Sequence, residues 1–237
     1  MLPQFYNTEV VKSEKLNENT FHLELKFKNS GFNFKAGQFV LVYRNLNGNE
    51  DKRAFSIASS PSKETIELLI RKYENGVLSL YLFNLKKGEF LKIRGPFGLF
   101  NVKSPLKDET IFIAGGTGIA PLRSMIYEIL KESPDKKVSL IFGFRYEHDF
   151  FFQNEIENLK NIYNNFRFYA CSTKPSDGWG GFKGRVTEII PSIINSPDNK
   201  DVYICGPNPM INEVLNLLIK KLNFKKEQIF FERWSSA

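Results

Sequence analysis

The sequence contains few of the residues on which several classes of protein depend. Two cysteines among 237 residues cannot build a disulfide framework, and neither has the spacing of a Cys/His metal site. An iron–sulfur cluster typically needs four thiolates, which this chain does not supply. No apolar run approaches the roughly 20 residues that span a bilayer, and the N-terminus lacks the apolar segment of a signal peptide. We therefore expect a cytoplasmic protein without a membrane span or a metal site.

Charge of one sign is only in modest excess. Lysine and arginine number 33 against 26 aspartates and glutamates, which gives a formal net charge of +7. A basic protein attracts acidic partners over long distances, so nucleic acid and an acidic protein both fit. No basic run of five or more residues occurs, however, and a surface that is simply solvated by lysine explains the excess equally well.

The length and the hydrophobic patterns predict two domains. Residues 1–104 contain short strands with alternating or β-branched patterns, for example at 21–27, 38–44 and 65–72, and one short helix at 76–85. This pattern indicates an antiparallel β-barrel. Residues 105–237 alternate five strands with helices, which indicates an α/β domain with a doubly wound parallel sheet. The polar, proline-containing segment 101–109 is the expected boundary.

The most informative local signal is IFIAGGTGIAPLRSM at 111–125. A strand leads into a turn with Gly115, Gly116 and Gly118, and Pro121 opens a helix. Glycines allow the backbone to approach a phosphate closely, and the start of a helix offers free N–H groups. The pattern is GxGxxP rather than GxGxxG, so by itself it also fits a plain structural turn.

Two stretches of the first domain carry weaker signals. RAFSIASSP at 53–61 places a cation, an aromatic ring and a hydroxyl at Arg53, Phe55 and Ser56, although a strand with one exposed arginine is an adequate alternative. NGVLSLYL at 75–82 begins a helix with Gly76 and Ser79, a place for an anion. An amphipathic helix that plugs the barrel explains its leucines equally well.

Taken together, seven motifs in order resemble one family. They are RxFS at 53–56, GVLS at 76–79, GPFG at 95–98, GGTGIAP at 115–121, FGFR at 142–145, CGPNPM at 205–210 and an aromatic residue after Glu232. This order is similar to that of the ferredoxin–NADP reductase superfamily of flavoenzymes, in its form without an iron–sulfur domain. The resemblance covers essentially the whole chain and implies a flavin-binding β-barrel domain followed by a nicotinamide-nucleotide-binding domain.

The resemblance implies FAD in the first domain, because the FMN-binding members usually carry an attached cluster domain. Arg53 would bind the flavin pyrophosphate, Phe55 would pack on the isoalloxazine ring and Ser56 would hydrogen-bond its central ring. Phe55 replaces the usual tyrosine and keeps only the stacking face. The remaining expected flavin contacts are Ala54, Arg71, Gly76, Val77, Leu78 and Ser79.

The resemblance places the nicotinamide nucleotide in the second domain. Gly116, Thr117, Gly118 and Pro121 match its nucleotide loop, and Gly206 and Met210 follow the matching cysteine. Cys205 would lie beside the nicotinamide ring and help to bring it within reach of the flavin without acting as a nucleophile. With Ser56 and Cys205, Glu232 completes the expected catalytic set. Trp234 matches an aromatic residue that covers the flavin, although three residues, 235–237, follow it here.

The preference between NADP and NAD depends on the segment after the strand at 166–172. Ser172, Lys174 and Arg185 are the expected partners of a 2′-phosphate, although the arginine that NADP-specific relatives place directly after the serine is missing. These residues favour NADPH. Asp177 is the contrary sign, since a carboxylate in this loop suits the ribose hydroxyls of NADH.

Other candidate signals are better explained as structure. His22 and His148 stand alone and are expected to be solvated or hydrogen-bonded rather than catalytic. SPSK at 60–63 matches a nucleophile motif without its companions, and DFFFQNEI at 149–156 is expected to pack in the core.

Three functions remain. The leading one is an FAD-dependent NAD(P)H oxidoreductase, monomeric or homodimeric, that passes electrons to a small acidic carrier such as ferredoxin or flavodoxin. The second is the reductase subunit of a multicomponent oxygenase, hydrogenase or dehydrogenase. The third is a non-catalytic nucleotide- or nucleic-acid-binding module, which leaves Arg53, Ser56, Cys205 and Glu232 without a joint explanation.

Overall fold

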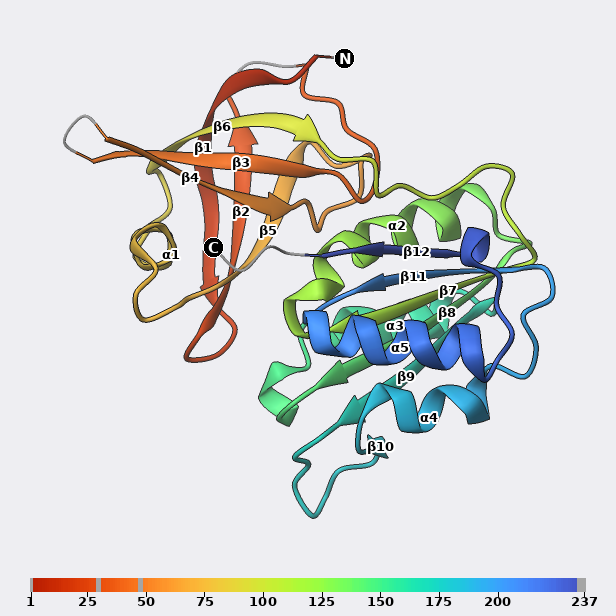
Figure 1. Cartoon of the computed structure of the whole chain (residues 1–237). Coiled ribbons are helices and arrows are strands. Elements are labelled where there is room, and N and C mark those ends of the chain that lie inside the picture. Colours follow the sequence, from red (N-terminus) through yellow and green to blue (C-terminus); the bar gives the residue numbers. More distant parts are fainter. Residues whose placement is uncertain (1, 29–30, 47–48, 234–237) are drawn as a thin grey trace.

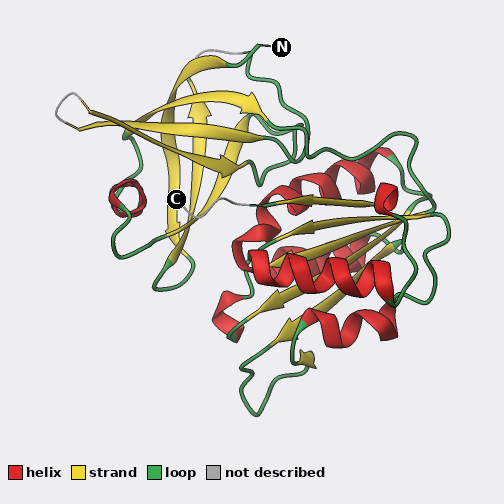
Figure 2. Ribbon diagram, in the orientation of Figure 1, coloured by secondary structure: helices red, strands yellow, loops and turns green. Residues whose placement is uncertain are grey.

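The computed structural model describes residues 2–28, 31–46 and 49–233, and it contains one sheet in each half of the chain (Figures 1 and 2). The first half consists of β1 (Gln4–Lys15), β2 (Thr20–Phe27), β3 (Phe39–Leu46), β4 (Asn49–Ser56), β5 (Thr65–Arg71), α1 (Val77–Phe83) and β6 (Phe90–Phe97). The second half consists of β7 (Glu109–Gly115), η1 (Gly116–Gly118), α2 (Ile119–Glu132), β8 (Lys137–Phe144), η2 (Glu147–Asp149), α3 (Gln153–Ile162), β9 (Phe166–Ser172), β10 (Phe182–Lys183), α4 (Val186–Ile193), β11 (Lys200–Cys205), α5 (Asn208–Lys220), η3 (Lys226–Gln228) and β12 (Ile229–Glu232).

The first sheet is antiparallel and curls into a barrel, as the sequence predicts. Its strand order is β4-β3-β6-β1-β2-β5. A bridge between Ile57, which follows β4, and Leu68 of β5 brings the two edge strands together. Apolar side chains from alternating strand positions, such as Leu23, Leu25 and Val40, fill the interior. Helix α1 packs Leu78 and Leu82 against this core.

The second sheet is parallel, with strand order β10-β9-β8-β7-β11-β12. Helices α2 and α3 cover one face and α4 and α5 the other (Figure 1). The five predicted strands are all present. The two-residue β10 is an addition that was not predicted, because a segment that short has no hydrophobic pattern. The predicted boundary between the domains falls in the connection from β6 to β7.

The order of the second sheet reverses between β7 and β11, because the chain proceeds from β7 towards β8 and β9 and then returns to add β11 and β12 on the other side. In open α/β sheets, ligands bind outside the carboxyl ends of the strands at such a reversal. Here those ends carry Gly115 and Cys205.

No helix among the residues that the structure describes has the length and apolar character needed to cross a membrane.

The turn after β7 lies directly against the loop after β11. A Cβ atom on Gly118 would meet the carbonyl group of Cys205 and would lie 2.7 Å from the backbone nitrogen of Gly206. Those neighbours are backbone atoms, which cannot rotate out of the way as a flexible side chain can. Gly118 therefore allows the carboxyl ends of β7 and β11 to meet.

Gly118→Ala should destabilise the protein by about 1–3 kcal/mol, the usual cost of overpacking a rigid interior. The matched control is Gly178→Ala, because a Cβ atom on Gly178 meets nothing within 4 Å; it should change stability by less than about 0.5 kcal/mol. Urea denaturation followed by circular dichroism measures both. Equal stability of the two variants would contradict the close contact.

Candidate active site between the two domains

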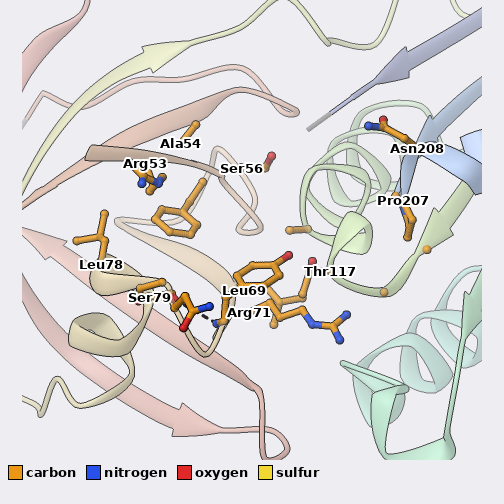
Figure 3. A pocket seen from close by; sticks show the side chains of 18 of the residues that line it. Arg53, Ala54, Ser56, Leu69, Arg71, Leu78, Ser79, Thr117, Pro207 and Asn208 are labelled. Carbon is orange, nitrogen blue, oxygen red and sulfur yellow. Dashed lines mark hydrogen bonds between the residues drawn. The ribbon is translucent and has the colours of Figure 1, made fainter. Parts of the chain in front are cut away.

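A pocket of about 770 Å³ lies between the barrel and the second sheet, and its size is in the range of roughly 300–1,000 Å³ that is usual for ligand sites. Both domains supply its walls (Figure 3). The barrel side consists of Arg53, Ala54, Phe55, Ser56, Leu69, Arg71, Tyr73, Asn75, Gly76, Val77, Leu78 and Ser79. The opposite side consists of Gly115, Gly116, Thr117, Ala120, Gly206, Pro207, Asn208 and Pro209.

The end of β4 supplies the central part of the barrel wall. Phe55 is half-buried and presents a ring to the pocket. The Arg53 side chain is 52% exposed, and its guanidinium donates to Asp51 Oδ1 at 2.7 Å. Arg71, at the end of β5, is also exposed in the pocket. Two cations, Arg53 and Arg71, therefore share this wall with the Phe55 ring.

The segment from Tyr73 to Ser79 forms a bend that completes the barrel wall. The Ser79 hydroxyl accepts a hydrogen bond from the Tyr73 N–H at 3.2 Å and donates one to the Gly76 carbonyl at 3.0 Å. A Cβ atom on Gly76 would collide with the Ser79 hydroxyl. Ser79 thus stabilises the bend both as a hydrogen-bond donor and as an acceptor.

Tyr73 and Asn75 were not among the predicted site residues. Tyr73 is 62% exposed and lines the pocket with Asn75. Both lie in the chain between Arg71 and Gly76, which are expected flavin contacts, and this position is the one sequence signal that places them at the site.

The turn after β7 and the loop after β11 form the opposite wall. Gly116 has a φ of +53° and open space where a Cβ atom would lie, so a ligand can approach its backbone. Thr117 lines the pocket beside it. Gly118 and Pro121 are buried behind this surface and support the turn. Met210 packs its sulfur against Gly115 and also lies behind the wall.

Cys205 lies at the carboxyl end of β11 and is 0% exposed. Desolvation by burial, reinforced by the negative charge of Glu232, raises the pKa of this thiol well above its usual value, and a hydrogen bond involving the Gly206 backbone opposes the shift only in part. The side chain is therefore a neutral, compact group beneath the pocket wall. Its neighbours Gly206 and Pro207 line the pocket itself.

Glu232 and Ser56 join the two domains at the edge of the pocket. The Ser56 hydroxyl is 3.3 Å from Glu232 Oε2, and β12 pairs Glu232 with Cys205 of β11. Burial raises the pKa of Glu232 to about 7, although the hydrogen bond from Ser56 acts in the opposite direction. A carboxyl group that titrates near neutrality is thus in contact with a pocket-lining hydroxyl.

The residues expected to bind a 2′-phosphate lie outside this pocket, at the carboxyl end of β9 and in the segment that follows it. Ser172 is fully buried, and its hydroxyl donates to the Arg145 carbonyl at 3.0 Å. Lys174 is exposed, with its ammonium 5.8 Å from the centre of the Tyr146 ring. Arg185 pairs with Glu213 at 2.7 Å. Of these three side chains, Lys174 alone has no carboxylate or carbonyl partner among the described contacts.

Two further sequence expectations concern the aromatic residue that would cover the flavin and the absence of a metal site. Trp234, the expected cover of the flavin, lies outside the described residues. Across the described ranges, no cluster of three or more His, Cys, Asp or Glu side chains is placed to hold a metal ion.

Both thiols should resist alkylation in the folded protein. Desolvation raises the pKa of Cys171 to about 11, Cys205 is shifted in the same direction, and only a thiolate reacts readily. Treatment with iodoacetamide at mildly alkaline pH, followed by mass spectrometry, should modify neither cysteine in buffer and both in denaturant. Rapid labelling of Cys205 in the folded protein would show that it is an accessible nucleophile.

Two family models match the chain in the same order as its two sheets. The oxidoreductase FAD-binding domain matches residues 7–102, and the oxidoreductase NAD-binding domain matches residues 112–216. The first match contains the barrel wall of the pocket, and the second contains the turn and loop that face it.

Known proteins resemble the chain over nearly its whole length. The phenol hydroxylase P5 protein of Acinetobacter pittii is 34% identical over 242 residues, which cover 100% of this chain and 67% of the relative. Ferredoxin–NADP reductase B of Sorangium cellulosum is 31% identical over 224 residues, covering 90% and 92%. The crystal structure of a ferredoxin NADP⁺ reductase from Neisseria gonorrhoeae with bound FAD and NADP has a TM-score of 0.81 at 21% identity, covering 96% and 98%. The chain therefore belongs to the ferredoxin–NADP reductase superfamily, with an FAD-binding domain followed by a NAD-binding domain.

Proposed function

We propose that the pocket holds the flavin of FAD against the barrel wall and the nicotinamide of NAD(P)H against the opposite wall, so that electrons pass between them as hydride. The observation that carries this proposal is the shared pocket. Arg53, Phe55 and Ser56 line it from the FAD-binding domain, and Gly116 and Gly206 line it from the NAD-binding domain. A site built from only one domain would not bring two cofactors together.

The residues of the barrel wall fit a flavin nucleotide. A bound flavin exchanges two electrons as hydride with nicotinamide and single electrons with a carrier protein. Phe55 offers the flat apolar face that a tricyclic ring needs. Arg53 and Arg71 bring two cations to the same wall, and guanidinium groups bind phosphate oxygens in pairs. We assign the pyrophosphate to these arginines and to the bend that Ser79 holds in shape.

The opposite wall fits a nicotinamide nucleotide. The backbone at Gly116 is open to the pocket, and it precedes the 14-residue helix α2, whose start favours an anion. We place the nucleotide pyrophosphate there. Cys205, neutral and small, lies beneath this wall and would support a nicotinamide ring bound against Gly206 and Pro207.

We propose that Glu232 determines the direction in which the Ser56 hydroxyl donates its hydrogen bond beside the flavin. When Glu232 is ionised, the Ser56 hydroxyl donates a hydrogen bond to Glu232 Oε2 at 3.3 Å. When Glu232 is protonated, its own hydroxyl donates to Ser56 Oγ, and the serine proton becomes free to point into the pocket. The protonated carboxyl group thus prepares Ser56 to donate a hydrogen bond to the flavin.

The identities of the nucleotide and of the electron acceptor are part of the proposal. NADPH remains the favoured nucleotide, but Lys174 and Arg145, both exposed beside Tyr146, are better placed than the buried Ser172 to meet a 2′-phosphate. The net charge of +7 supports a small acidic carrier such as ferredoxin or flavodoxin, because opposite charges speed the encounter. Two free, buried cysteines fit work in the reducing cytoplasm.

A second candidate is a reductase component that supplies electrons to an oxygenase. The specific observation in its favour is the 30% identity, over 98% of this chain, to a protein of Mycolicibacterium goodii named as the reductase component of a propane 2-monooxygenase. Both candidates use the same pocket and the same hydride step. They differ in the acceptor, which a stable complex with an oxygenase component would reveal.

The purified protein should be yellow, and NADPH should bleach it in the absence of oxygen at lower concentration than NADH does. Arg53→Met should weaken FAD binding about tenfold to a hundredfold, because a charged hydrogen bond contributes about 1.5–3 kcal/mol. Lys52→Met is the matched control, since it removes the same charge from the neighbouring residue of β4 outside the pocket. Absorbance titration measures both effects. A colourless protein that does not bind added FAD would refute the proposed function.

Reduction of the flavin by NADPH should slow as the pH rises through about 7. The pKa of Glu232 is about 7, so its protonated form is lost above that pH. Glu232→Gln should flatten the profile near neutrality, since an amide does not titrate. Asp135→Asn, which alters an exposed carboxylate outside the pocket, should leave the pH dependence near 7 unchanged. Rapid-mixing absorbance at a series of pH values around 7 measures these rates. An unchanged pH dependence in Glu232→Gln would exclude Glu232 as its source.

A further inference from the structure

A buried ion pair joins the two domains behind the pocket. Arg123 of α2 is 7% exposed and Glu67 of β5 is 4% exposed. The Arg123 Nη1 atom donates to Glu67 Oε2 at 2.7 Å and to the Ala58 carbonyl at 2.7 Å. Close by, the Ser124 hydroxyl donates to the Ser59 carbonyl at 2.6 Å. All three bonds run from the NAD-binding domain to the barrel.

The other side of the same guanidinium is held within its own domain. Arg123 Nε and Nη2 donate to the two oxygens of Glu155, both at 2.6 Å. Glu155 belongs to α3, which packs on the same face of the second sheet as α2. Arg123 is therefore fixed by Glu155 on one side and by Glu67 on the other, and only the second contact crosses between domains.

Glu67 is held equally firmly on the barrel side. Its carboxylate lies 3.2 Å from His22 Nε2 and also pairs with Lys63. Burial alone would raise its pKa, but the hydrogen bond from His22 and the positive charge of Arg123 outweigh that effect, and the pKa of Glu67 is lowered. Glu67 is thus ionised near neutral pH, and the contact with Arg123 is a true ion pair.

Both partners lie on elements that line the pocket. Ala120 lines it three residues before Arg123, which is about 4.5 Å along the helix at 1.5 Å per residue. Leu69 lines it two residues after Glu67, about 7 Å along the strand. Because a helix and a strand are stiff over such distances, a shift at the ion pair moves the two pocket walls by a similar amount.

We propose that the Glu67–Arg123 ion pair is a positioning device that sets the separation of the flavin and nicotinamide sites across the pocket. The inference rests on the proposed function and adds a residue pair that does not line the pocket. Guanidinium and carboxylate offer a fixed, directional geometry, whereas apolar contacts between domains would allow the walls to slide. A displacement of about 1 Å in a reacting geometry costs up to about a hundredfold in rate.

The test compares two carboxylates that hold the same guanidinium. Glu67→Gln removes the charge that crosses between domains, and Glu155→Gln removes the charge within one domain. In the FAD-loaded protein, rapid mixing with NADPH should show flavin reduction at saturating nucleotide slowed about tenfold in Glu67→Gln and changed less than about twofold in Glu155→Gln. The apparent affinity for NADPH should be unchanged in both, because the nucleotide loop is intact.

A second readout needs no turnover. Calorimetry of the flavin-free protein should show one unfolding transition in the unsubstituted protein and in Glu155→Gln. In Glu67→Gln the transition should broaden towards two, because the ion pair no longer reinforces the hydrogen bonds from Arg123 to Ala58 and from Ser124 to Ser59 that still join the domains. If Glu67→Gln fails to fold, Ser124→Ala supplies the same comparison through the milder loss of the hydrogen bond to Ser59.

The outcomes separate this inference from the proposed function. An unsubstituted protein that binds FAD and is bleached by NADPH supports the proposed function whatever the variants do. Equal slowing in Glu67→Gln and Glu155→Gln, or an unchanged rate in Glu67→Gln, would overturn the positioning role. Slowing confined to the variants that break a contact between domains, together with their broadened unfolding transition, would establish it.

Discussion

The contact on which the rest of the structure depends is that between the ends of β7 and β11. Gly118 brings the turn after β7 against the backbone of Cys205 and Gly206, with no room for a side chain between them. The sheet reverses its order at this place, so two strand ends open towards the same space. The Gly116 backbone, the Thr117 side chain and the Gly206–Pro207 loop then form one continuous wall.

The barrel contributes a wall of different chemistry. It presents Phe55, Arg53 and Arg71, which suit a flat ring with a charged tail, while the second domain presents mostly backbone and small residues. Several ion pairs and hydrogen bonds join the two domains, and two of them differ in their position relative to these walls. Glu67–Arg123 lies in the interior behind the pocket, and Ser56–Glu232 lies at its edge. The first is placed to maintain geometry, whereas the second contains a group that titrates near neutrality and can respond to pH.

The sequence predicted the parts of the fold whose signals are local. Alternating patterns identify the barrel strands, and apolar runs separated by helices identify the parallel sheet. The segments around Arg53, Gly76 and Gly116 line one pocket although about 60 residues separate the first from the last. The order of these segments along the chain was the signal, because it is similar to the order of motifs in the ferredoxin–NADP reductase superfamily. The roles of the individual residues remain proposals.

Other features lay beyond the sequence for physical reasons. A two-residue strand such as β10 has no period to detect. Ser172 was expected at a ligand, but the last position of a strand does not reveal which way the side chain turns, and here it faces the Arg145 carbonyl. The pairing of Glu67 with Arg123 joins residues 56 positions apart, and no local pattern distinguishes them from other charged residues. Such long-range contacts depend on how the two domains meet.

The central claim is that the two walls hold flavin and nicotinamide face to face for direct hydride transfer. The most direct test uses NADPH carrying deuterium at carbon 4 of the nicotinamide ring, on one side or on the other, in anaerobic rapid mixing with the FAD-loaded protein. Because the ring can present only one side to the flavin, one labelled form should slow the bleaching severalfold and the other should not. Equal effects from both labels, or bleaching without any isotope effect under conditions where hydride transfer limits the rate, would contradict the account.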